Sequence, residues 1–133
     1  MKKIEHIGIA VNNIDDANKL YEQLLDTKPY KSEDVESEGV VTSFFQSKNT
    51  KIELLQGTND NNAISKFIEK NGEGIHHIAF EVDDISDEIM RLKKLGFHII
   101  NETPKKGADN KLICFVHPKS TNGVLIELCQ TIK

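Results

Sequence analysis

The sequence predicts an α+β fold made of two similar βαβββ modules. Two segments of the chain are similar: HIGIAVNNIDD at residues 6 to 16 and HIAFEVDDISD at residues 77 to 87. A second pair follows, in which TKIELLQ at residues 50 to 56 corresponds to GVLIELCQ at residues 123 to 130. Similar units of a repeat fold alike and stack on one another. The order of expected elements is also the same in both halves.

The first half begins with alternating apolar residues that predict a strand at residues 3 to 11. A helix follows, for which Asp15 or Asp16 can serve as the N-cap. Its apolar stripe consists of Ala17, Leu20, Tyr21, Leu24 and Leu25. Three further strands are predicted at residues 28 to 36, 39 to 47 and 50 to 56.

The second half repeats this order after a short connecting helix. The connecting helix is predicted at residues 62 to 71, with Ile64, Phe67 and Ile68 on one side, and it ends at Gly72. A strand at residues 75 to 82 leads into a helix at about 86 to 95, which ends before Gly96. This helix carries Ile89, Met90, Leu92 and Leu95. The last three strands are predicted at residues 97 to 102, 111 to 117 and 123 to 130.

Length and composition predict one globular domain that spans residues 1 to 133. Module one covers about residues 1 to 57, a helical linker about 58 to 73, and module two about 74 to 133. The chain has 38% hydrophobic and 29% charged residues, which is ordinary globular composition, and its net charge of −4 argues against a nucleic-acid partner.

The chain lacks the sequence features of a membrane or secreted protein. No apolar run approaches the ~20 residues that span a bilayer, and the start of the chain lacks the apolar core of a secretory signal. We therefore expect no membrane association and a cytoplasmic location. Cys114 and Cys129 are isolated in strand-like segments, so we interpret them as reduced, buried small hydrophobic residues.

Histidine and glutamate occupy matched positions in the two modules. His6 and His77 are 71 residues apart, and Glu53 and Glu127 are 74 residues apart. Two imidazoles and two carboxylates suit a divalent metal ion. A single polar residue on a strand is more often solvated than a ligand, but here the residue types, the places in the repeat and the facing all match.

Side-chain alternation predicts that these four residues lie on equivalent faces of their strands. Successive strand residues point to opposite faces, so His6 shares a face with Gly8 while Ile7 and Ile9 point the other way. We expect the aliphatic face to lie under the helix, so that all four candidates lie on the face away from the helices. The neighbouring His76 falls on the aliphatic side, which favours His77 as the ligand.

The chain resembles the vicinal oxygen chelate superfamily over its full length, and within it the methylmalonyl-CoA epimerases. The resemblance is carried by EHIGIAV (residues 5 to 11), GVV (39 to 41), TKIELLQ (50 to 56), GIHHIAFEVDDI (74 to 85) and HPKSTNGVLIEL (117 to 128). The first, third and fourth segments are shared in looser form with other members, including glyoxalase I. The HPKS run followed by GVLIEL, and the doubled histidine, are more similar to the epimerases.

This resemblance implies that the eight strands form a cup-shaped, incompletely closed mixed sheet with the helices outside. It implies one divalent metal ion in the cup, with cobalt first and nickel, zinc or manganese as alternatives. The family's ligands fall on His6, Glu53, His77 and Glu127. It also implies a homodimer.

The implied reaction is the epimerisation of (2R)- and (2S)-methylmalonyl-CoA by removal of the C2 proton through a metal-stabilised enolate. Epimerisation needs a base on each face of the planar intermediate, and Glu127 is the first candidate. Some epimerases carry a glutamate directly after the GVV run, where this chain has Thr42. Glu53, Glu38 or a bound water therefore remain as candidates for the second base.

The partner implied by this resemblance is a small-molecule acyl-CoA, whose phosphates need cations. Lysines in or beside loops of the second half could supply them, namely Lys105, Lys106, Lys111 and Lys119. His117 is expected to shape the turn with Pro118, and His98 is given no function. Three other functions are compatible with the fold: glyoxalase I acting on a glutathione hemithioacetal, an iron-dependent dioxygenase, and a drug-sequestering protein without metal.

Overall fold

The computed structural model describes residue 1 and residues 3–133. Its internal contacts divide the chain into two compact units, one formed by His6–His76 and the other by Met1–Glu5 together with His77–Lys133. The single domain expected from the sequence stays a prediction.

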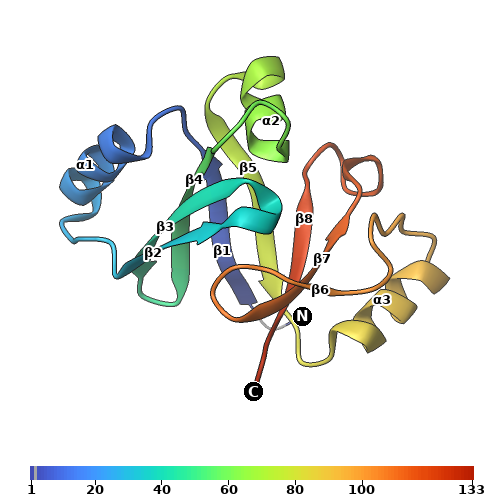
Figure 1. Ribbon diagram of the computed structural model, residues 1–133. Coiled ribbons are helices and arrows are strands. Elements are labelled where there is room, and N and C mark those ends of the chain that lie inside the picture. Colours follow the sequence, from blue (N-terminus) through green and yellow to red (C-terminus); the bar gives the residue numbers. More distant parts are fainter. Residues whose placement is uncertain (2) are drawn as a thin grey trace. The chain divides into compact units, whose positions relative to one another are not determined.

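The unit His6–His76 contains the first βαβββ module and the connecting helix (Figure 1). Its elements are β1 (Lys3–Ala10, of which residues 6–10 belong here), α1 (Ile14–Leu25), β2 (Lys31–Val35), the 3₁₀ turn η1 (Glu36–Glu38), β3 (Val40–Ser47), β4 (Thr50–Gly57) and α2 (Ala63–Asn71). The strands lie in the order β2-β3-β4-β1. β3 is antiparallel to β2 and β4, whereas β1 and β4 are parallel.

The other unit contains the second module. Its elements are β5 (Gly74–Glu81, from His77 on), α3 (Ile85–Lys94), β6 (Lys105–Lys106), β7 (Lys111–Val116), the 3₁₀ turn η2 (Pro118–Ser120) and β8 (Ile126–Thr131). Its strands lie in the order β5-β8-β7-β6, with β5 parallel to β8. The α+β class and the repeated βαβββ order are confirmed.

The strand predicted at residues 97 to 102 is wrong. In that segment Ile99 forms a single isolated bridge to Val116, and the second strand of this module is the two-residue β6. Residues 97 to 102 are FHIINE, whose three apolar members suggested a strand. Ile99 is buried in the α3 cluster and Phe97 packs against it, while Ile100 is exposed, so packing on α3 accounts for the apolar signal without a strand.

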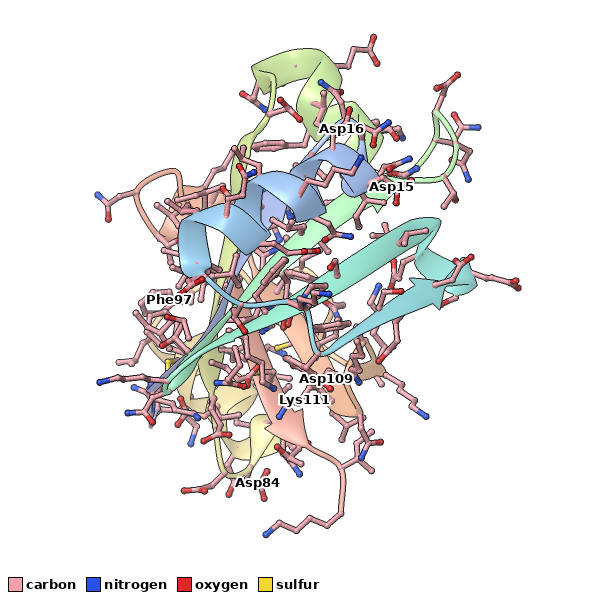
Figure 2. The ribbon with its side chains drawn as sticks, turned by 90° about the vertical axis from the view of Figure 1, so that its left-hand side faces the viewer. Asp15, Asp16, Asp84, Phe97, Asp109 and Lys111 are labelled. Atoms are coloured by element: carbon pink, nitrogen blue, oxygen red, sulfur yellow. The ribbon has the colours of Figure 1, made fainter. Side chains whose placement is uncertain are left out.

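The N-cap of α1 is Asn13, not Asp15 or Asp16. The Asn13 side chain accepts a hydrogen bond from the backbone N–H of Asp16 at 3.0 Å. Asp15 and Asp16 lie in the first helical turn (Figure 2), where negative charge is favourable beside the positive end of the helix dipole. In α3, Asp84 caps in the same way, accepting from the N–H of Asp87 at 3.0 Å.

The apolar stripes of both helices are narrower than predicted. Leu20 and Leu24 of α1 are 63% and 71% exposed, and Met90 of α3 is 58% exposed. The helix residues that pack on the first module are Ile14, Ala17, Tyr21 and Leu25. In α3 the buried residues are Ile85, Ile89 and Leu92, and Leu95 lies beyond the helix end and is exposed.

Each helix packs on the aliphatic face of its own module, as expected. In the first module, α1 packs against a cluster that includes Val11, Phe45 and Leu54. In the second, α3 packs against Val82, Cys114 and Leu128. The predicted connecting helix is also confirmed, since α2 begins after Asn62 and ends at Gly72. Within the described residues, no helix is both long enough and apolar enough to span a membrane.

A glutamine at the end of the last strand anchors the helix in each module. The Gln56 side chain accepts from the backbone N–H of Ile14 at 2.7 Å, and Gln130 accepts from the N–H of Ile85 at 2.9 Å. Both N–H groups lie in the first helical turn and have no partner within their helix. The two hydrogen bonds occur at equivalent places of the repeat, so the sequence duplication extends to the packing of the helices.

Both cysteines are reduced and fully buried, as predicted. Cys114 packs in the α3 cluster, and Cys129 packs with Ala79 and Ile113 on the opposite face of the sheet. Burial, together with the negative charge of Glu127, raises the pKa of the Cys114 thiol to about 12. The thiolate is therefore scarce at neutral pH, and the reactive form of this cysteine is suppressed.

We expect iodoacetamide to alkylate neither cysteine in the folded protein at pH 7.5 and both cysteines in denaturant. Burial limits access to both thiols, and the raised pKa of Cys114 removes its nucleophilic form. Peptide mass spectrometry measures the modification of each residue. Rapid alkylation of Cys114 without denaturant would contradict its burial.

Gly57, at the end of β4, lies against the N-terminus of α2. A Cβ atom at this position would come within 2.1 Å of Ser65 Oγ and 2.5 Å of Asn62 Oδ1. Asn62 is the buried N-cap of α2, and its Oδ1 accepts from the N–H of Ser65 at 2.8 Å. The close contact of strand and helix cap therefore excludes any side chain at residue 57.

Gly57→Ala is expected to lower the free energy of unfolding by about 1–3 kcal/mol, because the new methyl group displaces the cap of α2. Gly74→Ala is the matched control, since a Cβ there meets nothing within 4 Å. Urea unfolding followed by circular dichroism measures both variants. Equal stability of the two variants would show that α2 moves away at little cost.

Candidate metal and active site

The parallel strand pairs place a small residue beside each candidate glutamate. In the first module Gly8 of β1 is opposite Glu53 of β4, and in the second Ala79 of β5 is opposite Glu127 of β8. The third strand adds a phenylalanine in both cases, because Phe44 pairs with Glu53 and Phe115 pairs with Glu127. The register around the two glutamates is therefore the same.

His6 and Glu53 form a buried pair in the first module. Nδ1 of His6 lies 3.1 Å from Oε2 of Glu53, and both residues are 4% exposed. His6 is two residues before Gly8 on the same face of β1, which brings its ring beside the carboxylate. The sequence-based expectation that these two residues share a face is met within this unit.

His77 and Glu127 form the equivalent pair in the second module. Nε2 of His77 lies 3.4 Å from Oε1 of Glu127, and both residues are 5% exposed. The edge of the His77 ring also meets Phe115, with the ring centroids 6.0 Å apart and the planes at 86°. Phe115 thus fixes the position of this imidazole from one side.

His76 lies apart from this pair, as its alternation predicts. Its ring contacts Phe67 of α2 edge to face, with the centroids 5.1 Å apart. An aromatic contact of this kind gives His76 a packing role. His77 is therefore the histidine that has a carboxylate partner in the second module.

The chemistry of the two pairs fits a divalent cation. A buried carboxylate is costly unless it is paired or coordinates a metal, and each pair presents one imidazole nitrogen and one carboxylate. Imidazole and carboxylate together suit zinc, cobalt, nickel and manganese, among which the donor set alone does not choose. His6 and Glu53 would supply the donors of the first module, and His77 and Glu127 those of the second.

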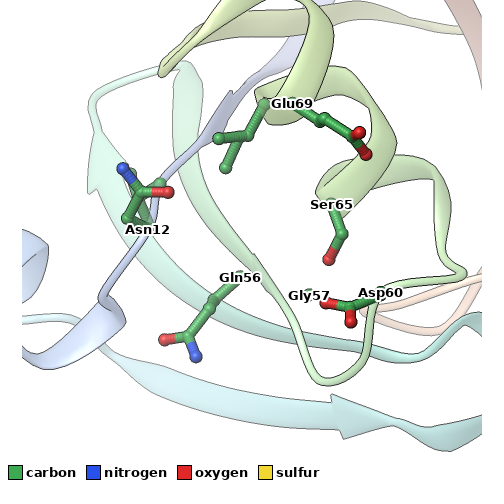
Figure 3. A pocket seen from close by; sticks show the side chains of 8 residues that line it. Asn12, Gln56, Gly57, Asp60, Ser65 and Glu69 are labelled. Atoms are coloured by element: carbon green, nitrogen blue, oxygen red, sulfur yellow. The ribbon is translucent and has the colours of Figure 1, made fainter.

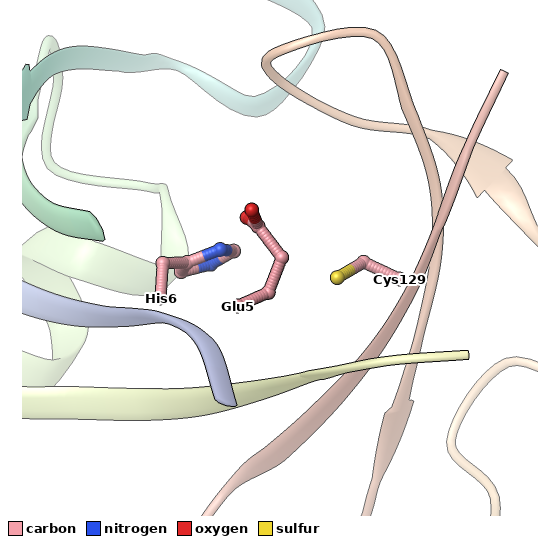
Figure 4. A group of neighbouring side chains, drawn as sticks. All are labelled: Glu5, His6 and Cys129. Atoms are coloured by element: carbon pink, nitrogen blue, oxygen red, sulfur yellow. The ribbon is translucent and has the colours of Figure 1, made fainter. Parts of the chain in front are cut away.

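A second polar cluster in the unit with His77–Lys133 was not predicted. Glu5 lies at the start of β1, and one of its carboxylate oxygens is within 4.8 Å of Cys129 Sγ (Figure 4). Nζ of Lys111 lies 4.0 Å from Oε2 of Glu5 and donates to Thr131 Oγ1 at 2.7 Å. Strand alternation assigns Glu5 to the face opposite His6, so no sequence signal indicated this contact.

Lys111 belongs to this cluster, although the sequence made it one of four candidate lysines for binding the phosphates of coenzyme A. Lys111 is 7% exposed, and its ammonium is engaged by Glu5 and Thr131. Lys105 and Lys106, by contrast, are exposed in the short strand β6. The structure therefore separates the buried lysine from the two that face solvent.

His117 shapes the turn η2, as expected. Its Nδ1 accepts a hydrogen bond from the backbone N–H of Lys119 at 3.0 Å. The His117 ring stacks on that of His98, with the centroids 4.9 Å apart and the planes at 2°. This contact gives His98, to which the sequence assigned no role, a packing partner.

A pocket of about 380 Å³ lies in the unit His6–His76, between the ends of β1 and β4 and helix α2. It is lined in part by Asn12, Gln56, Gly57, Asp60, Ser65 and Glu69 (Figure 3). Neither His6 nor Glu53 is among its lining residues. Its two acidic side chains make it a poor site for the phosphates of a nucleotide.

Comparisons with known proteins identify the family of this chain. The family model of the Glyoxalase/Bleomycin resistance protein/Dioxygenase superfamily matches residues 5–115. The mitochondrial methylmalonyl-CoA epimerase of Dictyostelium discoideum is 42% identical over 127 residues, which cover 95% of this chain and 76% of that protein. The ethylmalonyl-CoA/methylmalonyl-CoA epimerase of Cereibacter sphaeroides is 39% identical, covering 96% and 97% of the two chains.

The fold is also that of solved epimerase structures. A variant of the Streptomyces coelicolor methylmalonyl-CoA epimerase in complex with 2-nitronate-propionyl-CoA has a TM-score of 0.92 to this chain, at 30% identity, with 98% and 95% of the two chains covered. The match extends over nearly all of both proteins. The chain belongs to the glyoxalase/bleomycin resistance/dioxygenase superfamily and, within it, to the methylmalonyl-CoA epimerase family of isomerases.

Proposed function

We propose that this chain interconverts (2R)- and (2S)-methylmalonyl-CoA by removing and returning the proton on C2. The observation that carries the proposal is the pair of buried histidine–glutamate contacts at matched places of the repeat. The epimerase relatives at 42% and 39% identity support the same substrate class. We infer from them that the partner of this protein is a small-molecule acyl-CoA.

His6, Glu53, His77 and Glu127 are proposed to hold one divalent metal ion, cobalt first among the alternatives. The proton on C2 lies between a thioester and a carboxylate, and its removal places negative charge on their oxygens. A bound divalent cation offsets that charge as a Lewis acid. The two glutamates lie on β4 and β8, each of which is paired with a strand on both sides, so the backbone beneath these two donors is fixed.

Glu127 is proposed to take the C2 proton on one face of the substrate. A carboxylate that accepts a proton must be able to leave a partner, and Glu127 contacts one imidazole, His77 Nε2, at 3.4 Å. The resemblance to the epimerases, in which this position is the first candidate for a base, supports this choice. Glu53 is then mainly a ligand in the proposed site.

Glyoxalase I remains the alternative in the same superfamily, since it also moves a proton beside a metal ion. Its substrate is a glutathione hemithioacetal, not an acyl-CoA. The ligand in the Streptomyces coelicolor complex is an acyl-CoA nitronate. A nitronate is planar at carbon and carries negative charge on oxygen, as an enolate does, so this comparison favours the epimerase. A homodimer and a cytoplasmic location stay predictions.

The first test is nuclear magnetic resonance of methylmalonyl-CoA in deuterium oxide with the purified protein. We expect the C2 proton signal to disappear with the protein, to persist after treatment with a chelator, and to disappear again when cobalt is added back. The physical reason is that the carbon acid is too weak to exchange without a cation near its oxygens. No exchange in a metal-loaded sample would contradict the proposal and direct the search to glutathione adducts.

His77→Ala is expected to lower turnover by about 100-fold or more while the fold survives, because it removes one donor of the proposed site. His76→Ala is the matched control: it removes the neighbouring histidine, whose partner is Phe67, and should retain turnover. Circular dichroism and bound metal per chain are measured beside activity. Full activity of folded His77→Ala would contradict its role as a ligand.

A further inference from the structure

Residues 97 to 102 lie along β7 without forming a strand. Ile99 makes a single antiparallel bridge to Val116. The adjacent pair takes part as well, since the N–H of Ile100 donates to the C=O of Phe115 at 2.8 Å. Because Ile99 and Val116 are opposite each other, Ile100 is opposite Phe115 in the same antiparallel register.

The side chain of Asn101 completes this pair in place of the backbone. In a regular antiparallel ladder, Ile100 and Phe115 would exchange two hydrogen bonds between their backbone groups. The N–H of Phe115 instead donates to Oδ1 of Asn101, at 3.0 Å. The amide oxygen of Asn101 therefore satisfies a backbone group of β7 that would otherwise depend on the C=O of Ile100.

Phe115 lies beside both candidate donors of the second module. It is opposite Glu127 in the pairing of β7 with β8. Because its N–H and C=O both bond to residues 97 to 102, its pair with Glu127 is the kind without backbone hydrogen bonds, in which the Cα atoms are only about 4.5 Å apart. The Phe115 ring also meets the His77 ring, with the centroids 6.0 Å apart and the planes at 86°. A shift of Phe115 would therefore change the space available to both donors.

The other polar atom of the Asn101 side chain makes no such contact. Among the residues that the structure describes, Nδ2 of Asn101 is buried and has no hydrogen-bond partner. A buried donor without an acceptor lowers stability, so the favourable contact of this side chain is that of Oδ1. This single contact makes a sharp test possible, because aspartate keeps the acceptor whereas leucine removes it at a similar size.

From these contacts we propose that Asn101 is a positioning residue of the metal site, acting through Phe115 on His77. Its Oδ1 fixes the backbone of β7 at Phe115, and the Phe115 ring then restrains the imidazole of His77 beside Glu127. All four residues belong to the unit with His77–Lys133. The inference rests on the proposed function, in which His77 and Glu127 hold the metal ion. Changes to residues that orient a metal ligand typically cost about 10- to 100-fold in metal affinity.

Titration of the metal-free protein with cobalt(II), followed by visible absorption, tests this assignment. For Asn101→Leu we expect the dissociation constant to rise about tenfold or more and the absorption bands of the bound ion to shift, because the imidazole of His77 is no longer held in one orientation. For Asn101→Asp, which keeps the acceptor for the Phe115 N–H, we expect a constant within about threefold of that of the unchanged protein.

Asn110→Ala is the matched control. It removes a hydrogen bond of the same kind, from Nδ2 of Asn110 to the C=O of Ile132 at 3.0 Å. Asn110 has a φ of 56°, which alanine rarely adopts, so this variant loses stability too. Its affinity for cobalt should stay within about twofold of that of the unchanged protein, which separates a loss of stability from a loss of positioning.

Phe115→Leu supplies a second test that does not depend on the folding of Asn101→Leu. It keeps the backbone bond to Asn101 and removes the ring, so the dissociation constant for cobalt should also rise about tenfold. In this background Asn101→Leu should add less than about twofold, since both changes act through the same ring. Additive losses, unchanged affinity in either single variant, or equal losses in Asn101→Asp and Asn101→Leu would overturn the assignment.

A measurement without metal separates this inference from the proposed function. In the metal-free protein, the NMR signals of the carbon-bound protons of the His77 ring depend on the neighbouring Phe115 ring. They should move in Asn101→Leu and stay in place in Asn110→Ala, and unmoved signals in Asn101→Leu would overturn the role of Asn101. Failure of the unchanged protein to bind cobalt would instead overturn the proposed metal site, and these signals would still show whether Asn101 positions His77.

Discussion

The parallel pairing of two strands within each module is the constraint on which the candidate site depends. Parallel strands need a crossover connection, and in each module the chain between them contains a helix and two further strands. The pairing sets Gly8 beside Glu53 and Ala79 beside Glu127. Gly8 and Ala79 have small side chains and leave space beside each carboxylate. The histidine two residues before each of them, His6 or His77, occupies that space.

Much of this arrangement could be predicted because strand periodicity is simple. A period of two separates His6 from Ile7 and His77 from His76 without knowledge of the fold. The duplication then supplies an independent check, since a chance polar residue has no reason to recur at the same register position. The helices were placed correctly for the same reason, because the aliphatic faces had to be covered.

The errors have physical causes that local sequence does not reveal. Leu20, Leu24 and Met90 fit a helical stripe, but their side chains are exposed, and other residues of each helix form the contacts with the sheet. Residues 97 to 102 have strand composition, yet Phe97 and Ile99 pack against the α3 cluster and Ile99 makes a single isolated bridge.

The two glutamine anchors limit how a carboxylate of this fold can move. Gln56 and Gln130 each stand three residues after a candidate glutamate and tie the end of its strand to the first turn of a helix. In the second module β8 is also held along its length by β5 and β7. A displacement of the backbone at Glu127 would therefore also move β5, β7 and the start of α3, to which β8 is hydrogen-bonded. A change of partner by this carboxylate would therefore come from rotation about its own side-chain bonds and not from movement of its strand.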